Sequence, residues 1–173
     1  MNSSEIQPVD YPDYYNKYFE LLDSVDLLEG LQQSKDHFIT YMKNIPEDTY
    51  AFAYQQGKWS IAEVVQHLID FERVFQYRAL CIARHPRIEL KGYDHDVFAE
   101  NARRSLGNKN QLLEHYDIAR SSSIKLFESF SKEELLNRGV LLGQSTNVAA
   151  LGFFICGHQK HHLNILEERY LKK

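Results

Sequence analysis

Three histidines in this sequence have the spacing of a metal site. His158 and His162 lie four residues apart near the C-terminus, and His67 lies in a separate segment far upstream. On a helix, residues four apart project from one face, one turn from each other, so this pair can chelate a single ion. A histidine facing them from another helix would complete three ligands and leave a fourth position open. Open sites of this kind are typical of catalytic zinc, whereas structural zinc usually has four protein ligands.

These histidines continue the apolar stripes of their segments. His67 is three residues after Val64 and four before Phe71. The C-terminal stripe comprises Leu151, Phe154, Ile155, His158, His162, Ile165 and Leu166. A buried imidazole needs a polar partner, and one divalent cation would satisfy all three; imidazole suits zinc, nickel, iron or copper. The alternatives are core histidines bonded to a carbonyl or water, or a polar helix edge.

Neighbouring residues bear on the ligand set. His161 follows His158 by three residues and could chelate with it, but His161 is offset from the apolar stripe, so we expect it at the edge of the site. Glu63 and Asp70 are the carboxylates that could orient the imidazoles, although Glu63 also fits a helix cap and both could be solvated. Cys156 lies about 200° around the helix from His158, which predicts core packing.

Other catalytic motifs are absent from the sequence. It contains no His-Glu-x-x-His of a zincin and no Glu-x-x-His of a di-iron carboxylate bundle. Cys-x-x-Cys and the Gly-x-Ser-x-Gly elbow of serine hydrolases are also missing. The histidines are therefore the strongest candidates for chemistry.

Four long helices are predicted to position these histidines. Ser60 and Glu63 indicate a capping box at the start of the second helix, with Trp59 before the cap and able to pack onto Val64. His85-Pro86 ends this helix near residue 84. The other long helices are predicted over residues 14–43 with a break near Ser24, 110–130 and 147–170, and shorter ones near 97–103 and 131–134.

These elements predict an all-α fold: an up-and-down four-helix bundle with short additional helices and almost no β structure. Residues 1–13 are predicted to form an N-terminal arm and residues 14–173 a single domain, since this length suffices for one full core. Four tyrosines near the start would line either a homodimer contact or the contact of the arm with its own bundle. They are Tyr11, Tyr14, Tyr15 and Tyr18.

Composition argues against several partners. The net charge of −4 provides no basic face for nucleic acid. No apolar run approaches the roughly 18 residues of a membrane helix, and the N-terminus lacks the pattern of a signal peptide. Cys81 and Cys156 are too few for a disulfide framework. We therefore expect a cytoplasmic protein without membrane or nucleic-acid partners.

Two motifs resemble a known superfamily. The stretch from Trp59 to Glu72, Trp-Ser-x-x-Glu-Val-x-x-His-Leu-x-Asp-x-Glu, resembles the second-helix signature of the DinB/YfiT-like superfamily. The Gly157-His158-x-x-x-His162 motif is similar to its C-terminal ligand motif, and the spacing agrees over residues 14–171. The resemblance implies a four-helix bundle, frequently homodimeric, in which these two histidines and His67 hold a divalent metal. We expect zinc or nickel.

The resemblance implies a choice of activities. Some members are thiol-dependent S-transferases or isomerases that use a thiol such as bacillithiol or mycothiol, and others are assigned only as metal-dependent hydrolases. We predict a metal-dependent enzyme that activates a small thiol or water, with thiol transfer preferred by analogy. Asp94 and Asp96, in a loop with Tyr93 and His95, are candidate acid/base or substrate contacts. The alternatives are a non-catalytic metal-binding bundle, as sensor or structural protein, and a metal-free bundle.

Overall fold

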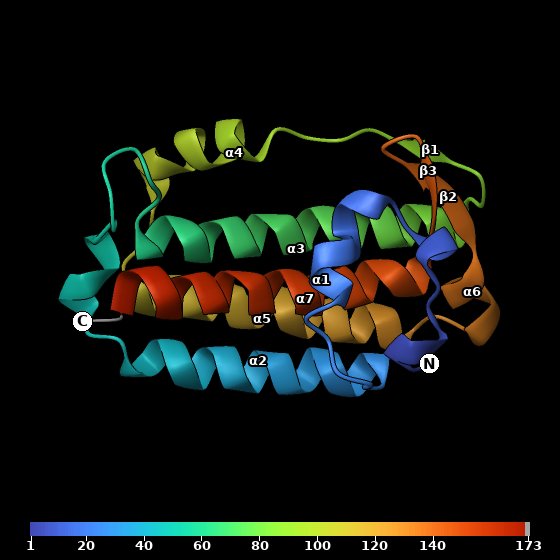
Figure 1. Ribbon diagram of the computed structural model, residues 1–173, viewed down its shortest axis with the longest axis horizontal. Coiled ribbons are helices and arrows are strands. Elements are labelled where there is room, and N and C mark those ends of the chain that lie inside the picture. Colours follow the sequence, from blue (N-terminus) through green and yellow to red (C-terminus); the bar gives the residue numbers. More distant parts are fainter. Residues whose placement is uncertain (172–173) are drawn as a thin grey trace.

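Four long helices form the body of the molecule in the computed structural model, which describes residues 1–171 (Figure 1). They are α2 (Leu27–Asn44), α3 (Ile61–Arg84), α5 (Lys109–Glu128) and α7 (Val148–Ile165). Both α2 and α3 pack against α5 and α7, so α2 and α3 lie diagonally across the bundle. The predicted four-helix bundle is confirmed.

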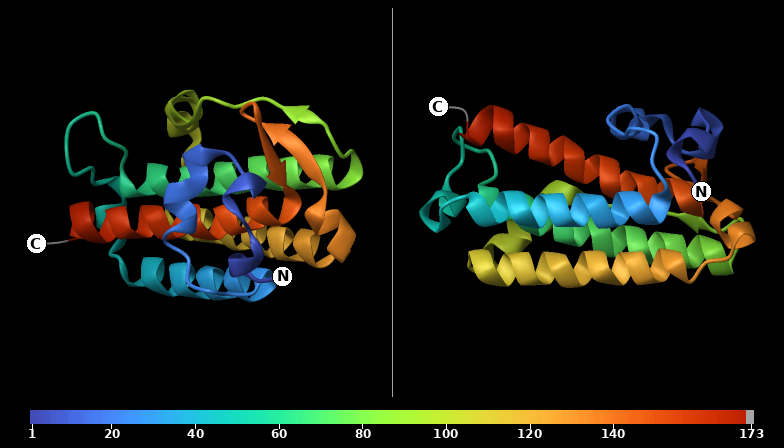
Figure 2. Two further views of the ribbon diagram at one scale, coloured as in Figure 1. Left: turned by 45° about the vertical axis from the view of Figure 1, so that its right-hand side comes forward. Right: turned by 90° about the horizontal axis from the view of Figure 1, so that it is seen from below.

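The helix directions do not simply alternate along the chain. α3 and α5 run in one direction, and α2 and α7 run in the other (Figures 1 and 2). The start of α5 lies at the end of α2, where the Lys109 ammonium donates to the Lys43 carbonyl at 2.8 Å. The reason is the long connection 85–108, which returns outside the bundle through α4 (His95–Ala102) and η5 (Arg103–Ser105). One long crossover thus replaces a short loop of the expected up-and-down order.

Side-chain caps fix the starts of the two histidine-bearing helices. The Ser60 hydroxyl accepts the Glu63 N–H at 3.3 Å, and the Glu63 carboxylate accepts the Ser60 N–H at 2.7 Å, which confirms the capping box of α3. At the start of α7, the Asn147 side chain accepts the Ala150 N–H at 2.8 Å. Because a helix has a fixed period, each start determines which later residues face inward.

Short helices precede and connect the long ones. Those before the bundle are η1 (Ser3–Glu5), η2 (Pro8–Asp10), η3 (Asp13–Tyr15) and α1 (Asn16–Phe19). The others are η4 (Glu47–Ala51), α6 (Lys132–Leu136) and η6 (Leu166–Leu171). The helix predicted over residues 14–43 is interrupted at residues 20–26, a wider break than expected. Tyr11, Tyr15 and Tyr18 are buried against their own bundle, whereas Tyr14 is 54% exposed.

A small sheet closes one end of the bundle. Its order is β1 (Glu89–Leu90), β2 (Arg138–Leu141) and β3 (Gln144–Asn147), with β1 parallel and β3 antiparallel to β2. Leu142 and Gly143 join the hairpin with φ of 53° and 76°, the left-handed values of a two-residue hairpin turn. The expectation of almost no β structure was wrong here, because Val140 and Leu141 followed by this turn favour a hairpin.

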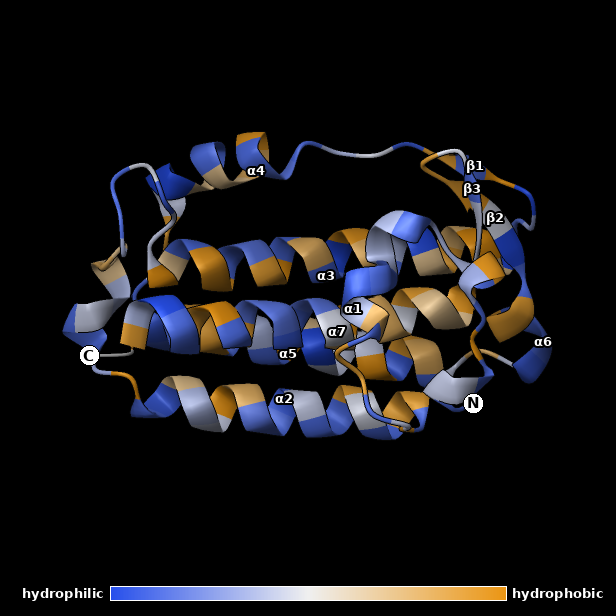
Figure 3. Cartoon of the chain, viewed as in Figure 1, coloured by the Kyte–Doolittle hydropathy of each residue, from blue (hydrophilic) through white to orange (hydrophobic). Residues whose placement is uncertain are grey.

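The core extends along the whole bundle. One buried cluster, around Phe75 and Phe154, adjoins the sheet, and a second, around Phe38 and Ile69, fills the other end. Figure 3 shows hydrophobic residues along the first half of α7 and more hydrophilic ones in its second half. The histidines of α7 therefore lie where its apolar stripe enters a more polar region. No helix within residues 1–171 is long and apolar enough to span a membrane.

Candidate metal centre

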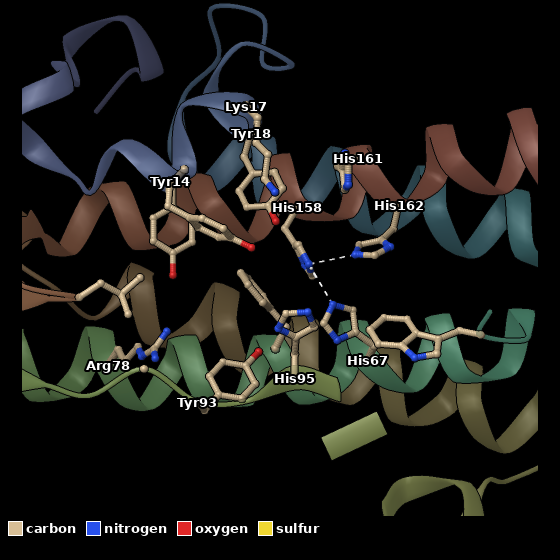
Figure 4. Close-up of a pocket in the computed structure, with 15 residues that line it drawn as sticks. Tyr14, Lys17, Tyr18, His67, Arg78, Tyr93, His95, His158, His161 and His162 are labelled. Carbon is tan, nitrogen blue, oxygen red and sulfur yellow. Dashed lines mark hydrogen bonds between the residues drawn. The ribbon is translucent and has the colours of Figure 1, made fainter. Parts of the chain in front are cut away.

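Three imidazole nitrogens converge between α3 and α7. His67 Nε2 lies 3.0 Å from His158 Nε2, and His162 Nε2 lies 3.1 Å from the same atom. The three potential ligand atoms all lie within 4.8 Å of one another. Figure 4 shows the His158 ring reaching both other rings. The structure thus brings together the three histidines indicated by the sequence.

This donor set fits a divalent cation. Zn–N bonds of about 2.0–2.1 Å place the nitrogens of a tetrahedral site about 3.3 Å apart, close to the separations from His158 Nε2 to its two neighbours. Hydrogen bonds alone fit less well, because a neutral ring nitrogen offers one proton or one lone pair, and His158 Nε2 faces two partners.

Burial keeps the three rings neutral at pH 7. Desolvation, followed by the adjacent histidines, holds the pKa values of His158 and His162 well below their ordinary range. Desolvation, with a smaller effect of His95, lowers the pKa of His67 to about 4. Metals bind the neutral form of imidazole, so these side chains need lose no proton before binding at neutral pH.

Aromatic packing holds the His158 ring in place. Its Nδ1 is buried and has no hydrogen-bond partner within the described part of the chain. Phe71 stacks on the ring at a centroid separation of 3.7 Å, and Tyr18 meets it edge-on at 5.3 Å. Metal-bound histidines usually donate their second N–H to a carboxylate or carbonyl. At His158, ring contacts supply the orientation instead.

Gly157 allows α1 to approach α7 beside this ring. A Cβ atom at Gly157 would lie 2.4 Å from the carbonyl oxygen of Tyr18, so any other residue would push the two segments apart. The glycine of the Gly-His-x-x-x-His motif therefore lets the N-terminal segment place Tyr18 against His158.

A cavity of about 430 Å³ opens beside the three nitrogens. Its walls come from the N-terminal segment, α3, the 85–108 connection, the hairpin turn and α7. The lining includes Tyr15, Tyr18, Arg78, Tyr93, His95 and Leu142. Trp59 covers His67 at a ring separation of 4.8 Å. The volume and the mixture of aromatic and polar walls suit a small molecule.

The other predicted site residues lie around this centre. His161 lines the cavity and contacts the Tyr18 ring at 5.6 Å, outside the converging nitrogens. The Asp94 carboxylate caps α4, accepting the N–H groups of Asp96 and Val97 at 3.0 and 3.1 Å. Asp96 is exposed and borders a smaller hollow. Neither aspartate lines the large cavity.

The candidate supporting carboxylates have other partners. Glu63 serves the capping box and pairs with Arg103. Asp70 accepts from the Gln66 amide at 2.9 Å. Among the hydrogen bonds of residues 1–171, none joins either carboxylate to the three histidines. Cys156 is buried away from them, and desolvation raises the pKa of its thiol to about 11, which agrees with core packing.

Sequence reasoning missed several residues of the cavity wall. Trp59 was expected only as a packing residue of the helix start, and Arg78, Tyr15 and Tyr18 were not assigned to the site. Arg78 did leave a signal, because it follows Phe71 by two turns and therefore interrupts the inward stripe of α3 with a charge. Tyr15 and Tyr18 have no such signal in the sequence, because their position depends on how the N-terminal segment folds back onto the bundle.

The fold and the site define a four-helix bundle with an open cluster of three histidines. The chain belongs to the DinB superfamily, whose family model matches residues 31–166. YfiT from Bacillus subtilis, described as a probable metal-dependent hydrolase with an unusual four-helix bundle topology, has a similar structure: the TM-score is 0.72 at 14% identity, covering 92% of this chain and 91% of YfiT.

A mycothiol-dependent maleylpyruvate isomerase shares the fold with a TM-score of 0.66 at 10% identity. The match covers 80% of this chain but only 59% of the isomerase. No curated protein sequence matches the chain. At these identities the structural likeness shows the fold, and the chemistry must be argued from the residues of this chain.

Proposed function

We propose that this protein is a metal-dependent enzyme in which His67, His158 and His162 hold one divalent ion, zinc or nickel. The main support is the position of three neutral imidazole nitrogens at the wall of a cavity of about 430 Å³. Within residues 1–171 the cluster contains no fourth histidine, cysteine or carboxylate, which suits an open catalytic site better than a closed structural one.

The preferred reaction is transfer of a small thiol to an electrophile. A divalent ion bound here favours the deprotonated, nucleophilic form of a thiol or of water. Lys17 and Arg78 line the cavity, and none of the lining residues within residues 1–171 is acidic. This charge distribution suits an anionic thiolate. A mycothiol-dependent isomerase of the same fold adds support, whereas the description of YfiT supports hydrolysis as the alternative.

The surrounding residues would orient reactants. Phe71 and Trp59 fix the imidazole rings and keep water from their faces. Desolvation raises the pKa values of Tyr18 and Tyr93 above their ordinary value, at Tyr93 against an opposing effect of the Arg78 charge, so both hydroxyl groups stay protonated at neutral pH. They can therefore donate hydrogen bonds to a substrate in the cavity.

Thiol dependence is the test of this proposal. Zinc- or nickel-loaded protein should convert 1-chloro-2,4-dinitrobenzene to the thioether, with release of chloride, only when a thiol is supplied. The panel should include 2-mercaptoethanol, bacillithiol and mycothiol, with the metal-free protein giving the background rate. Turnover of ester substrates without thiol would favour hydrolysis instead. Metal binding without turnover in either assay would contradict the enzyme and support a sensor or structural bundle.

Asp94 and Asp96 provide a second prediction, because the structure gives Asp94 a capping role. Asp94→Ala should lower turnover by at most about fivefold, since a lost N-cap costs α4 about 1 kcal/mol of stability and α4 carries His95 over the cavity. Asp94→Ser keeps a capping oxygen and should restore the wild-type rate. Equal loss in both variants would show that the carboxylate itself acts on the substrate, and wild-type turnover in Asp94→Ala and Asp96→Ala would remove both residues from the mechanism.

A cytoplasmic location and a homodimer also belong to the proposal. Both cysteines are free thiols, which suits a reducing compartment. Three of the four N-terminal tyrosines are buried in their own chain and do not supply a dimer surface. Homodimer formation therefore rests on the habit of the superfamily, and sedimentation equilibrium measures it directly.

A further inference from the structure

Arg78 is a buried cation at the cavity without an anionic partner. It is 3% exposed, and its guanidinium lies 4.9 Å from the centre of the Phe75 ring and 5.4 Å from that of Tyr93. Nη2 donates to the Lys91 carbonyl at 3.0 Å, but no carboxylate pairs with Arg78 within residues 1–171. The Tyr15 hydroxyl is a further polar neighbour of the guanidinium. A guanidinium has five N–H donors, so several remain for an anion from outside.

A second buried arginine, Arg120, shows how a buried guanidinium is normally paired in this fold. Arg120 is 1% exposed and donates to the Glu72 carboxylate at 2.6 Å, to the Ser34 hydroxyl at 2.6 Å and to the Leu31 carbonyl at 3.2 Å. Buried charges are normally paired in this way, because desolvation of an unpaired ion is costly. Arg78 departs from this rule at the wall of the cavity, where a ligand from outside can reach it.

The rest of the cavity adds positive charge and hydrogen-bond donors. Lys17 lies over the rings of Tyr14 and Tyr18, also without a carboxylate partner in the described chain. Around Arg78, burial raises the pKa values of Tyr15 and Tyr93, although Arg78 opposes the shift, so both phenols remain donors. Among the groups that shift the pKa of Tyr93, the acid is Asp70, which accepts a hydrogen bond from Gln66 and lies outside the cavity lining.

We propose that Arg78 binds a carboxylate group of the ligand that occupies the cavity, assisted by the hydroxyl groups of Tyr15 and Tyr93. The planar guanidinium fork matches a carboxylate with two parallel hydrogen bonds. This inference rests on the proposed function, since it names the chemical class of that enzyme's thiol or electrophile. The carboxylate can belong to either reactant, and the two sources are separated below.

The position of Arg78 indicates a binding role at a distance from the reacting atoms. Arg78 lies eleven positions after His67 on α3, which places their Cα atoms about 16 Å apart along the helix. Between them Phe71 lines the cavity as an apolar floor, and it stacks on the buried Phe75 ring at 3.9 Å. A carboxylate at Arg78 would therefore anchor one end of a ligand whose reactive atom lies at the histidines. Loss of the anchor should act mainly on KM.

Binding to metal-free protein tests the subsite without the metal. The probes are succinate and its uncharged analogue succinamide, titrated by NMR. Wild-type protein should bind succinate more tightly than succinamide, and Arg78→Met should weaken succinate binding by about tenfold or more while leaving succinamide unchanged. Arg73→Met, an exposed arginine on the same helix, is the matched control and should bind as wild type. Equal succinate affinity in wild type and Arg78→Met overturns the inference.

Stability separates a binding role from a structural one. Because removing Arg78 leaves no buried carboxylate without a cation, Arg78→Met should keep the melting temperature within about 3 °C of wild type while losing the binding of succinate. Arg78→Lys keeps the positive charge but lacks the planar guanidinium fork. Its affinity for succinate should therefore fall between those of wild type and Arg78→Met. Unchanged succinate binding in folded Arg78→Lys and Arg78→Met proteins would again contradict the assignment.

Steady-state kinetics on the loaded enzyme then identify which reactant carries the carboxylate. With uncharged 2-mercaptoethanol as thiol, a rise in KM for 4-chloro-3-nitrobenzoate but not for its amide in Arg78→Met assigns the carboxylate to the electrophile. With that amide as electrophile, a rise in the KM of Arg78→Met for 3-mercaptopropionate but not for 2-mercaptoethanol assigns the carboxylate to the thiol. Equal effects on charged and uncharged reactants in both arms overturn the inference. Succinate binding by a protein that takes up no metal would contradict the proposed enzyme alone.

Discussion

Replacing His67 by alanine is expected to empty the metal site while leaving the bundle folded. His67 is the member of the cluster carried by α3, and without it the ion would be left with the two histidines of α7. Loss of an outer partner of a metal ligand already costs 10–100-fold in affinity, so loss of a direct ligand should cost more than about 100-fold. Elemental mass spectrometry of protein purified without a His-tag or nickel column should find about one ion per wild-type chain and almost none in the variant.

Two neighbouring histidines serve as matched controls for this result. His95 and His161 both line the cavity, and the His95 ring lies 5.9 Å from that of His67, yet neither belongs to the converging group. His95→Ala and His161→Ala should therefore keep their metal. The metal proposal is wrong if His67→Ala retains a full complement, or if wild-type protein stays metal-free after reconstitution with zinc and with nickel.

Thermal unfolding gives an independent readout of the same substitution. An ion that binds only the folded state stabilises it by about 2.7 kcal/mol when its free concentration is 100 times the dissociation constant. Added zinc or nickel should raise the melting temperature of the wild type and leave that of His67→Ala nearly unchanged. In the absence of metal the two proteins should unfold at similar temperatures, because the core clusters on both sides of the site do not depend on the ion.

Local sequence signals carried the prediction of the histidine cluster. The Ser60–Glu63 capping box fixes the phase of α3, and the apolar stripe of α7 continues through His158 and His162, so the inward direction of all three rings follows from helical periodicity. The requirement that buried imidazoles have partners then brings the two helices together. The inward direction of each ring thus depends on residues within a few turns, whereas the pairing of the two helices drew further support from the resemblance to the superfamily.

The walls of the cavity depend on long-range packing, and periodicity does not encode them. The 85–108 connection returns along the bundle, makes α3 and α5 parallel, and brings Tyr93 and His95 to the site. The β-hairpin places Leu142 at the cavity, and Gly157 admits the N-terminal segment with Tyr18. None of these contacts has a signature within one turn of sequence. The interruption of the α3 stripe by Arg78 is the exception.

The largest loss of stability is expected from Arg120→Met. Arg120 joins three helices, because it lies on α5 and its guanidinium bonds to Glu72 of α3 and to Leu31 and Ser34 of α2. Burial alone would lower the pKa of Arg120, but the adjacent Glu72 carboxylate raises it above its ordinary value. Removing the guanidinium leaves Glu72 buried at 1% exposure without its cation, at a cost of about 3–5 kcal/mol. Urea denaturation of metal-free protein measures this directly.

A double variant distinguishes a broken ion pair from lost packing. When both charges are replaced by apolar side chains, no buried ion is left without a partner, and such replacements are often neutral. Glu72→Leu/Arg120→Met should therefore be more stable than Arg120→Met alone. A double variant that is as unstable as the sum of the single changes would show that shape, and not charge, holds these helices together.

Arg78→Met completes the comparison, since it removes a second buried arginine from the same protein. Its guanidinium donates to one backbone carbonyl, and its removal leaves no buried carboxylate without a cation. The free energy of unfolding should therefore change by less than about 1 kcal/mol. The expected order of stability is thus wild type close to Arg78→Met, with Arg120→Met far below both. If the two arginine variants were equally unstable, Arg78 would be a structural residue with an internal partner. If they differ as expected, the fold keeps one buried cation for its own stability and leaves the other for an anion from outside.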